Sequence, residues 1–147
     1  MRRPAERTGD MTQARRILVV DDSPEVLDVT RTVLNSDGYD VVAVPSGEEA
    51  LERLGDEAFD LVLLDINMPG MDGWETLRLI RADDELYDLP VVLFSVKGEV
   101  QDKVMGLQEG AVEYITKPFI VDDLLNRVRA VVEGAPGCDP RVPAVDR

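Results

Sequence analysis

The stretch from Leu61 to Gly73, LVLLDINMPGMDG, decides the fold. Its four consecutive apolar residues indicate a strand buried on both faces, and Asp65 ends the run because a buried strand tolerates a charge only where it stops. Pro69, Gly70 and Gly73 then predict a loop before the next helix. The stretch therefore places a carboxylate where a central strand opens into a loop, which is the edge at which open α/β sheets bind ligands.

The same strand-then-helix pattern recurs along the chain. The five predicted strands are residues 17–20, 39–44, 61–65, 90–94 and a short strand around residues 114–115. A helical pattern follows each of them, and the first helix has Ser23 as its N-cap and Pro24 at its first position. Five such units predict an α/β fold, with one five-stranded parallel sheet and helices on both faces.

Apolar spacing predicts which helical residues face the core. These are Val26, Val29, Thr30 and Val33 in the first helix, Val100, Val104 and Leu107 in the fourth, and Val121, Leu124, Leu125, Val128 and Val131 in the last. Gly106 lies inside the fourth helix and is expected to weaken it, because glycine is a poor helix former.

The ends of the chain differ in composition from its middle. Residues 1–15 are polar and arginine-rich and predict a disordered tail, residues 16–133 form one domain, and residues 134–147 are rich in proline and glycine and predict a flexible tail. Cys138 is the sole cysteine, so no internal disulfide can form, which agrees with a reducing cytoplasm. The sequence shows no signal peptide and no apolar run of membrane-spanning length.

Charge and composition exclude several functions. The 147 residues carry a net charge of −14 and include no histidine. The chain therefore has no Ser-His-Asp or Cys-His catalytic centre and no histidine metal ligand, so oxygen atoms would hold any metal. The acidic balance argues against direct binding of nucleic acid and against attachment to an anionic membrane.

Polar residues stand at the ends of the predicted strands. Right-handed crossovers bring these ends to one edge, which gathers Asp21, Asp22, Asp65, Ser95 and Lys117. Clustered carboxylates raise one another's pKa, and a magnesium ion relieves this best. A carboxylate beside such an ion can attack phosphorus and become an aspartyl phosphate, while a lysine neutralises the phosphoryl oxygens. Singly, each residue has a structural explanation as a cap or turn residue; together they indicate a site.

The segments ILVVDDSP, LVLLDINMPGMDG, VVLFS and YITKPF jointly resemble the receiver domain of bacterial two-component response regulators, over about Ile17 to Val132. The resemblance implies a flavodoxin-like (βα)5 fold with strand order 2-1-3-4-5. It also implies that Asp65 accepts a phosphoryl group from a histidine kinase or a histidine phosphotransfer protein. The segment after Val132 is too short to fold as an output domain. The chain is therefore expected to be either a stand-alone receiver, which the natural-looking end at Arg147 favours, or a receiver taken from a longer protein.

The resemblance assigns a metal set to the acidic residues. Asp22, Asp65 and the main-chain carbonyl of Asn67 would hold Mg²⁺, with Mn²⁺ or Ca²⁺ as substitutes, and Asp21 would assist through water.

The resemblance also assigns a switch. Lys117 would pair with the phosphoryl group, and its peptide bond to Pro118 is expected to be cis. Ser95 and Tyr114 would be the switch residues: the hydroxyl moves toward the phosphate and the ring turns inward. This movement would remodel the face formed by the fourth helix, fifth strand and fifth helix, where an unidentified downstream protein or a second copy of the chain would bind.

Two other functions stay open. A pseudo-receiver, which binds partners without being phosphorylated, usually lacks an acidic, hydroxyl or lysine residue, but here each position is filled. A phosphohydrolase of the haloacid dehalogenase type needs a second aspartate two residues after its nucleophile; this chain has Asn67 after Asp65, and Pro24 after Asp22. The favoured interpretation is a switch that slowly loses its phosphoryl group and is not a turnover enzyme.

Overall fold

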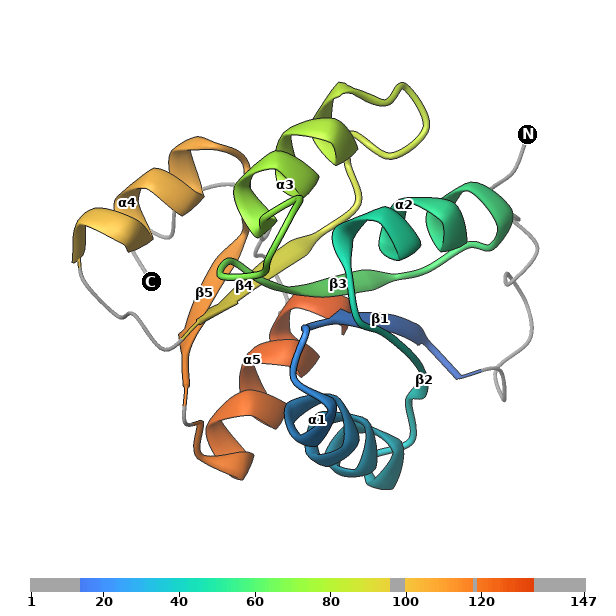
Figure 1. Ribbon diagram of the computed structural model, residues 1–147. Helices are drawn as coiled ribbons and strands as arrows, with labels where there is room; N and C mark the ends of the chain where they lie inside the picture. Colours follow the sequence, from blue (N-terminus) through green and yellow to red (C-terminus); the bar gives the residue numbers. More distant parts are fainter. Residues whose placement is uncertain (1–13, 96–99, 118, 134–147) are drawn as a thin grey trace.

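The computed structural model describes residues 14–95, 100–117 and 119–133 and forms alternating strands and helices (Figure 1). The elements are β1 (Arg16–Val20), α1 (Pro24–Ser36), β2 (Asp40–Val44), α2 (Gly47–Asp56), β3 (Leu61–Asp65), α3 (Gly73–Ala82), β4 (Val91–Ser95), α4 (Val100–Gln108), β5 (Glu113–Thr116) and α5 (Val121–Glu133). Most of the two predicted tails, residues 1–13 and 134–147, lies outside the described residues, as do the side chains of residues 100–103.

The five strands form one sheet in the order β2-β1-β3-β4-β5, and every neighbouring pair is parallel. This confirms the predicted sheet and its strand order. The register pairs Val20 with Leu64 and Asp65 with Phe94, so β1, β3 and β4 end at the same edge. The order reverses at β1, which makes the carboxyl ends of β1 and β3 the switch point where open α/β sheets bind ligands.

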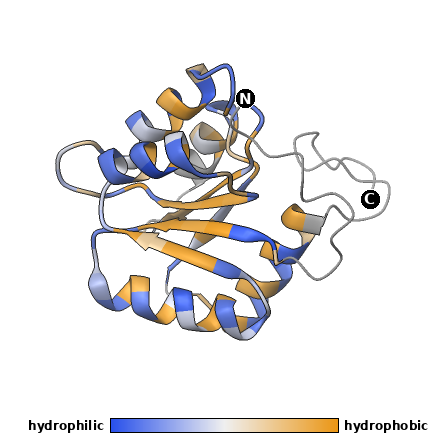
Figure 2. Ribbon diagram, turned by 90° about the vertical axis from the view of Figure 1, so that its right-hand side faces the viewer, coloured by the Kyte–Doolittle hydropathy of each residue, from blue (hydrophilic) through white to orange (hydrophobic). Residues whose placement is uncertain are grey.

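Helices cover both faces of the sheet. Figure 1 shows α1 and α5 on one face and α2, α3 and α4 on the other. All five residues of β3 are buried, as expected for a strand covered on both sides. Figure 2 shows the largely apolar strands between helices that carry both polar and apolar residues. None of the described helices is long and apolar enough to cross a bilayer.

Alternate strand residues enter two separate cores. The core under α2 and α3 includes Leu18, Val20, Leu54, Leu64, Leu77, Ile80 and Leu93. The core under α1 and α5 includes Ile17, Val19, Leu34, Leu63, Phe94, Leu124 and Val128. The strands are therefore apolar on both faces, which explains their uninterrupted apolar sequence.

Two of the inward residues predicted in α1 and α5 are exposed. Val29 is exposed because the buried side of α1 is centred on Thr30 and Leu34, and Val29 lies beside that side. Val121 is exposed because it stands in the first turn of α5, ahead of Leu124, where burial begins. The other inward residues predicted in α1 and α5 are buried or half-buried.

The predicted inward face of α4 is wrong. Val104 and Leu107 are 47% and 53% exposed, whereas Gly106 is buried. A Cβ atom on Gly106 would lie 2.6 Å from Cδ1 of Leu93 and 3.5 Å from Cδ2 of Tyr114. The helix thus approaches the sheet closely through its glycine. Val104 and Leu107, on either side of this glycine, therefore face outward. The spacing of apolar residues in the sequence does not show that the glycine faces the sheet.

We predict that Thr30→Val stabilises the fold. Thr30 is fully buried in α1, and its hydroxyl has no hydrogen-bond partner within the described structure. Valine has the same shape and the same χ1 preference, and it removes the desolvated hydroxyl. The free energy of unfolding in urea should rise by about 1 kcal/mol. The control Thr30→Ser keeps the hydroxyl and loses the methyl group, so it should be less stable than wild type. A valine variant no more stable than wild type would contradict this account.

Candidate functional site

Two acidic residues follow β1. Asp21 is completely buried, and its Oδ1 accepts a 2.9 Å hydrogen bond from the backbone N–H of Ser23, the N-cap of α1. Its own N–H donates to the carbonyl of Val44 at the end of β2, at 3.2 Å. Asp22, the next residue, is exposed. One carboxylate is therefore fixed inside the sheet edge, while its neighbour faces solvent.

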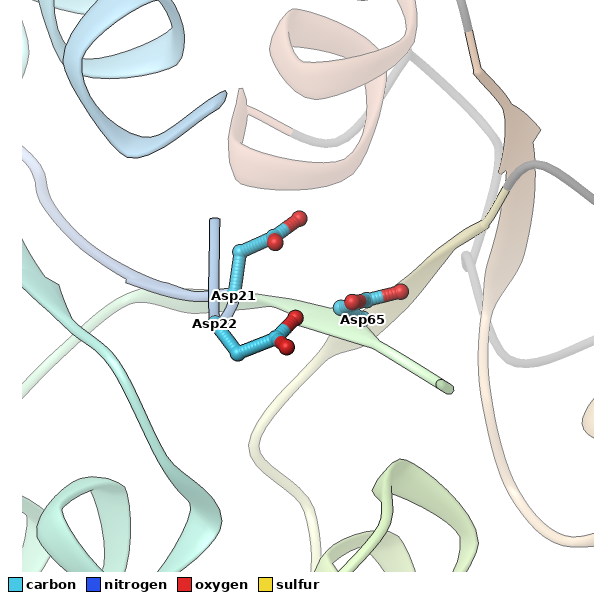
Figure 3. A group of neighbouring side chains, drawn as sticks. All are labelled: Asp21, Asp22 and Asp65. Atoms are coloured by element: carbon cyan, nitrogen blue, oxygen red, sulfur yellow. The ribbon is translucent and has the colours of Figure 1, made fainter. Parts of the chain in front are cut away.

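The third acidic residue, Asp65, ends β3 and is only 3% exposed. Figure 3 shows Asp21 and Asp22 at the end of one strand and Asp65 at the end of its neighbour, on the same edge of the sheet. One oxygen from each of the three carboxylates lies within 4.8 Å of the others. Such a set of hard oxygen donors suits Mg²⁺, Ca²⁺ or Mn²⁺.

Lys117, which follows β5, reaches into this cluster. Its Nζ lies 2.8 Å from Oδ2 of Asp21 and 3.7 Å from Oδ1 of Asp65. Nζ also lies 5.0 Å from the ring centroid of Phe94, at a cation–π distance. One lysine beside three carboxylates leaves the cluster with net negative charge, so the cluster fits a divalent cation. Pro118, and with it the predicted cis peptide, lies outside the described residues.

Burial and the neighbouring charges together shift the pKa of Asp65. Its pKa is raised to about 6, chiefly because burial disfavours the charged carboxylate. The negative charges of Asp21 and, less strongly, Asp22 raise this pKa further, whereas the charge of Lys117 and the N–H of Asn67 lower it. A bound cation would favour the ionised form, and ionisation is what makes the oxygen a nucleophile.

The hydroxyl of Ser95, at the end of β4, contacts the loop after Asp65. Ser95 is fully buried, and its Oγ accepts a 3.1 Å hydrogen bond from the side-chain amide of Asn67. The resemblance implies only a main-chain role for Asn67, so this side-chain contact was not predicted. The two residues are 28 positions apart, and only the pairing of β3 with β4 brings them together. Tyr114, in β5, is buried against the core under α2 and α3.

The loop between β3 and α3 is held by a close backbone approach. The N–H of Gly73 donates to the carbonyl of Ile66 at 2.9 Å. A Cβ atom on Gly73 would collide with the carbonyl oxygen of Asp65 and lie 2.6 Å from Cα of Ile66. Asp72 caps α3 by accepting the N–H of Glu75 at 3.0 Å. The start of α3 thus rests directly on the end of β3 and fixes where Asp65 stands.

A family model for the response regulator receiver domain matches residues 17–129. The chain belongs to the response regulator receiver domain family. The fold and the sheet-edge acids of this receiver domain agree with that assignment.

Solved structures give the same result. The receiver domain is 28% identical to the chemotaxis protein CheY4 of Vibrio cholerae, with 81% of this chain and 99% of that one covered and a TM-score of 0.77. It is 30% identical to a putative response regulator from Chloroflexus aurantiacus, with 82% and 99% covered and a TM-score of 0.79. It is also 30% identical to the signal receiver domain of a signal transduction histidine kinase from Syntrophus aciditrophicus, with 91% and 98% covered and a TM-score of 0.76.

We predict that Asp65→Asn stabilises the metal-free receiver domain in a pH-dependent way. An acid whose pKa is raised by folding, here from 3.8 to about 6, binds its proton more tightly in the folded state. Its contribution to stability is therefore lost as pH rises through this range. In a chelator at pH 7.5 the variant should be more stable in urea by about 2 kcal/mol, and the difference should disappear near pH 4. A difference that is the same at both pH values would contradict the raised pKa of Asp65.

We predict that Gly73→Ala destabilises the domain by about 2 kcal/mol or more, because the new methyl group overlaps backbone atoms that cannot move independently. The matched control is Gly55→Ala in α2, where a Cβ atom meets nothing within 4 Å and should be neutral or stabilising. Urea unfolding of both variants measures the difference. Equal stability of the two variants would show that Gly73 is not held by close approach.

Proposed function

We propose that this receiver domain is a phosphoryl-accepting switch of a two-component or phosphorelay pathway and that Asp65 is the phosphoacceptor. The observation that carries the proposal is the arrangement around Asp65: a buried carboxylate at the sheet edge, with two further carboxylates within 4.8 Å and a lysine 3.7 Å away. Membership of the receiver family supports a histidine kinase or a histidine phosphotransfer protein as the phosphoryl donor.

The reaction is an in-line displacement at phosphorus. A carboxylate oxygen of Asp65 forms a bond to phosphorus while the bond from phosphorus to the donor breaks. The leaving group, an imidazole nitrogen of the partner or the acetate of acetyl phosphate, departs with the electron pair. Lys117 pairs with a phosphoryl oxygen by shifting its ammonium group from Asp21, and Ser95 donates a hydrogen bond to another. Slow hydrolysis of the aspartyl phosphate resets the switch without making the domain a turnover enzyme.

The acidic cluster would hold Mg²⁺ through Asp22, Asp65 and the main-chain carbonyl of Asn67, with Mn²⁺ or Ca²⁺ as substitutes. When bound, the ion supplies positive charge that neutralises the phosphoryl oxygens. Both oxygens of Asp21 already accept hydrogen bonds, one from Ser23 and one from Lys117. This engagement supports a role for Asp21 through water rather than as a direct ligand.

The face formed by α4, β5 and α5 is the proposed output surface. Exposed apolar side chains on α4 and at the start of α5 support a protein contact there, with a downstream protein or a second copy of the chain. They are Val104, Met105, Leu107, Ile120 and Val121. The net charge of −14 disfavours nucleic acid as a direct partner. The lone Cys138 supports a cytoplasmic setting.

Intact-mass spectrometry after incubation with acetyl phosphate and Mg²⁺ tests the proposal. Wild type should gain one phosphoryl group; Asp65→Asn, and wild type in a chelator, should gain none. The control Asp28→Asn, which changes an exposed carboxylate on α1, should behave as wild type. No adduct on wild type, with acetyl phosphate or with a phosphorylated kinase, would favour the pseudo-receiver. Turnover of a small phosphate ester would favour the phosphohydrolase.

A further inference from the structure

The side chain of Asn67 joins the phosphoacceptor loop to the predicted switch hydroxyl. Its backbone N–H donates to Oδ1 of Asp65 at 3.3 Å, and its side-chain Nδ2 donates to Oγ of Ser95 at 3.1 Å. One residue therefore contacts both the carboxylate of Asp65 and the hydroxyl of Ser95. Ser95 is held on its other side as well, because its carbonyl accepts a 2.7 Å hydrogen bond from the N–H of Lys117.

The direction of the hydrogen bond between Asn67 and Ser95 determines its effect on the Ser95 hydroxyl. A serine hydroxyl has one hydrogen to donate and two lone pairs that accept. The amide nitrogen of Asn67 can only donate, so this bond uses a lone pair of the Ser95 oxygen and does not use its hydrogen. A phosphoryl group on Asp65 offers strong acceptor oxygens. A hydroxyl that already accepts a hydrogen bond is polarised into a better donor.

We propose that the side chain of Asn67 is a positioning residue that holds the hydroxyl of Ser95 ready to donate to a phosphoryl oxygen on Asp65. The inference rests on the proposed function and adds to it a residue whose side chain had no assigned role. The opposite effect, a restraint that phosphorylation must break, would require Ser95 to give up this bond before it donates. The donor–acceptor polarity makes that unnecessary, because Ser95 can accept from Asn67 and donate to the phosphoryl group together.

A double-mutant cycle tests the inference. The variants are Asn67→Leu, Ser95→Ala and the double variant; leucine has a similar volume to asparagine, lacks the donor, and leaves the main-chain carbonyl in place. The probe is beryllium fluoride with Mg²⁺, a stable mimic of the phosphoryl group, and its bound fraction is followed by fluorine NMR. Urea unfolding and a separate Mg²⁺ titration check that folding and metal binding are unchanged.

Each single substitution should weaken binding of the mimic by about three- to tenfold, the range expected for one net hydrogen bond. In the Ser95→Ala background the leucine substitution should have no further effect, because its target is gone. Unchanged binding by Asn67→Leu, tighter binding, or the same loss with and without the Ser95 hydroxyl would each overturn the inference while the proposed function stands. Failure of wild type to bind the mimic would overturn the proposed function, and this inference with it.

Discussion

Like charge buried at one edge of the sheet is the constraint on which the rest of this structure depends. Asp21 and Asp65 are almost completely buried, and Asp22 adds a third carboxylate beside them. Carboxylates this close raise one another's pKa unless positive charge or N–H donors compensate. The compensating groups come from elsewhere in the fold: Lys117 from the end of β5 and the N–H of Ser23 from the start of α1. The site therefore exists only when the sheet is complete, which ties its chemistry to the folded state.

Close packing sets the geometry of this edge as firmly as charge does. Gly73 lets α3 begin against the carbonyl of Asp65, and Gly106 lets α4 lie against Leu93 and Tyr114. A methyl group at Gly73 would overlap backbone atoms of Asp65 and Ile66, and one at Gly106 would displace the side chain of Leu93, which pairs with Tyr114 across β4 and β5. α4 therefore packs on β4 and β5, the two strands that carry the predicted switch residues Ser95 and Tyr114.

The sequence predicts the fold and the composition of the site because both depend on local patterns. Uninterrupted apolar runs that end in Asp21, Asp65 or Ser95 mark the strands and their shared edge. Prediction from the sequence fails where a contact joins residues that are far apart along the chain. The face of α4 was mispredicted because Gly106, which has no side chain, makes the closest contact with the sheet. The contact between Asn67 and Ser95 joins the ends of two neighbouring strands and leaves no spacing pattern in the sequence.

The excess of negative charge lies at only one of the two ends of the strands that the following contacts describe. At the edge where the strands begin, Arg16 pairs with Asp40 at 3.2 Å and with Glu57 at 2.8 Å, and Arg53 also pairs with Glu57, so two arginines face these two carboxylates. At the same edge Arg81 donates to the carbonyls of Leu89 and Gly110, at 2.7 Å each. At the opposite edge, one lysine faces three carboxylates. Net negative charge at a buried place costs stability. A ligand that brings positive charge and hydrogen-bond acceptors would recover that stability. The proposed switch would use this excess of negative charge, because only a group with differential interactions in two states can shift the population between them.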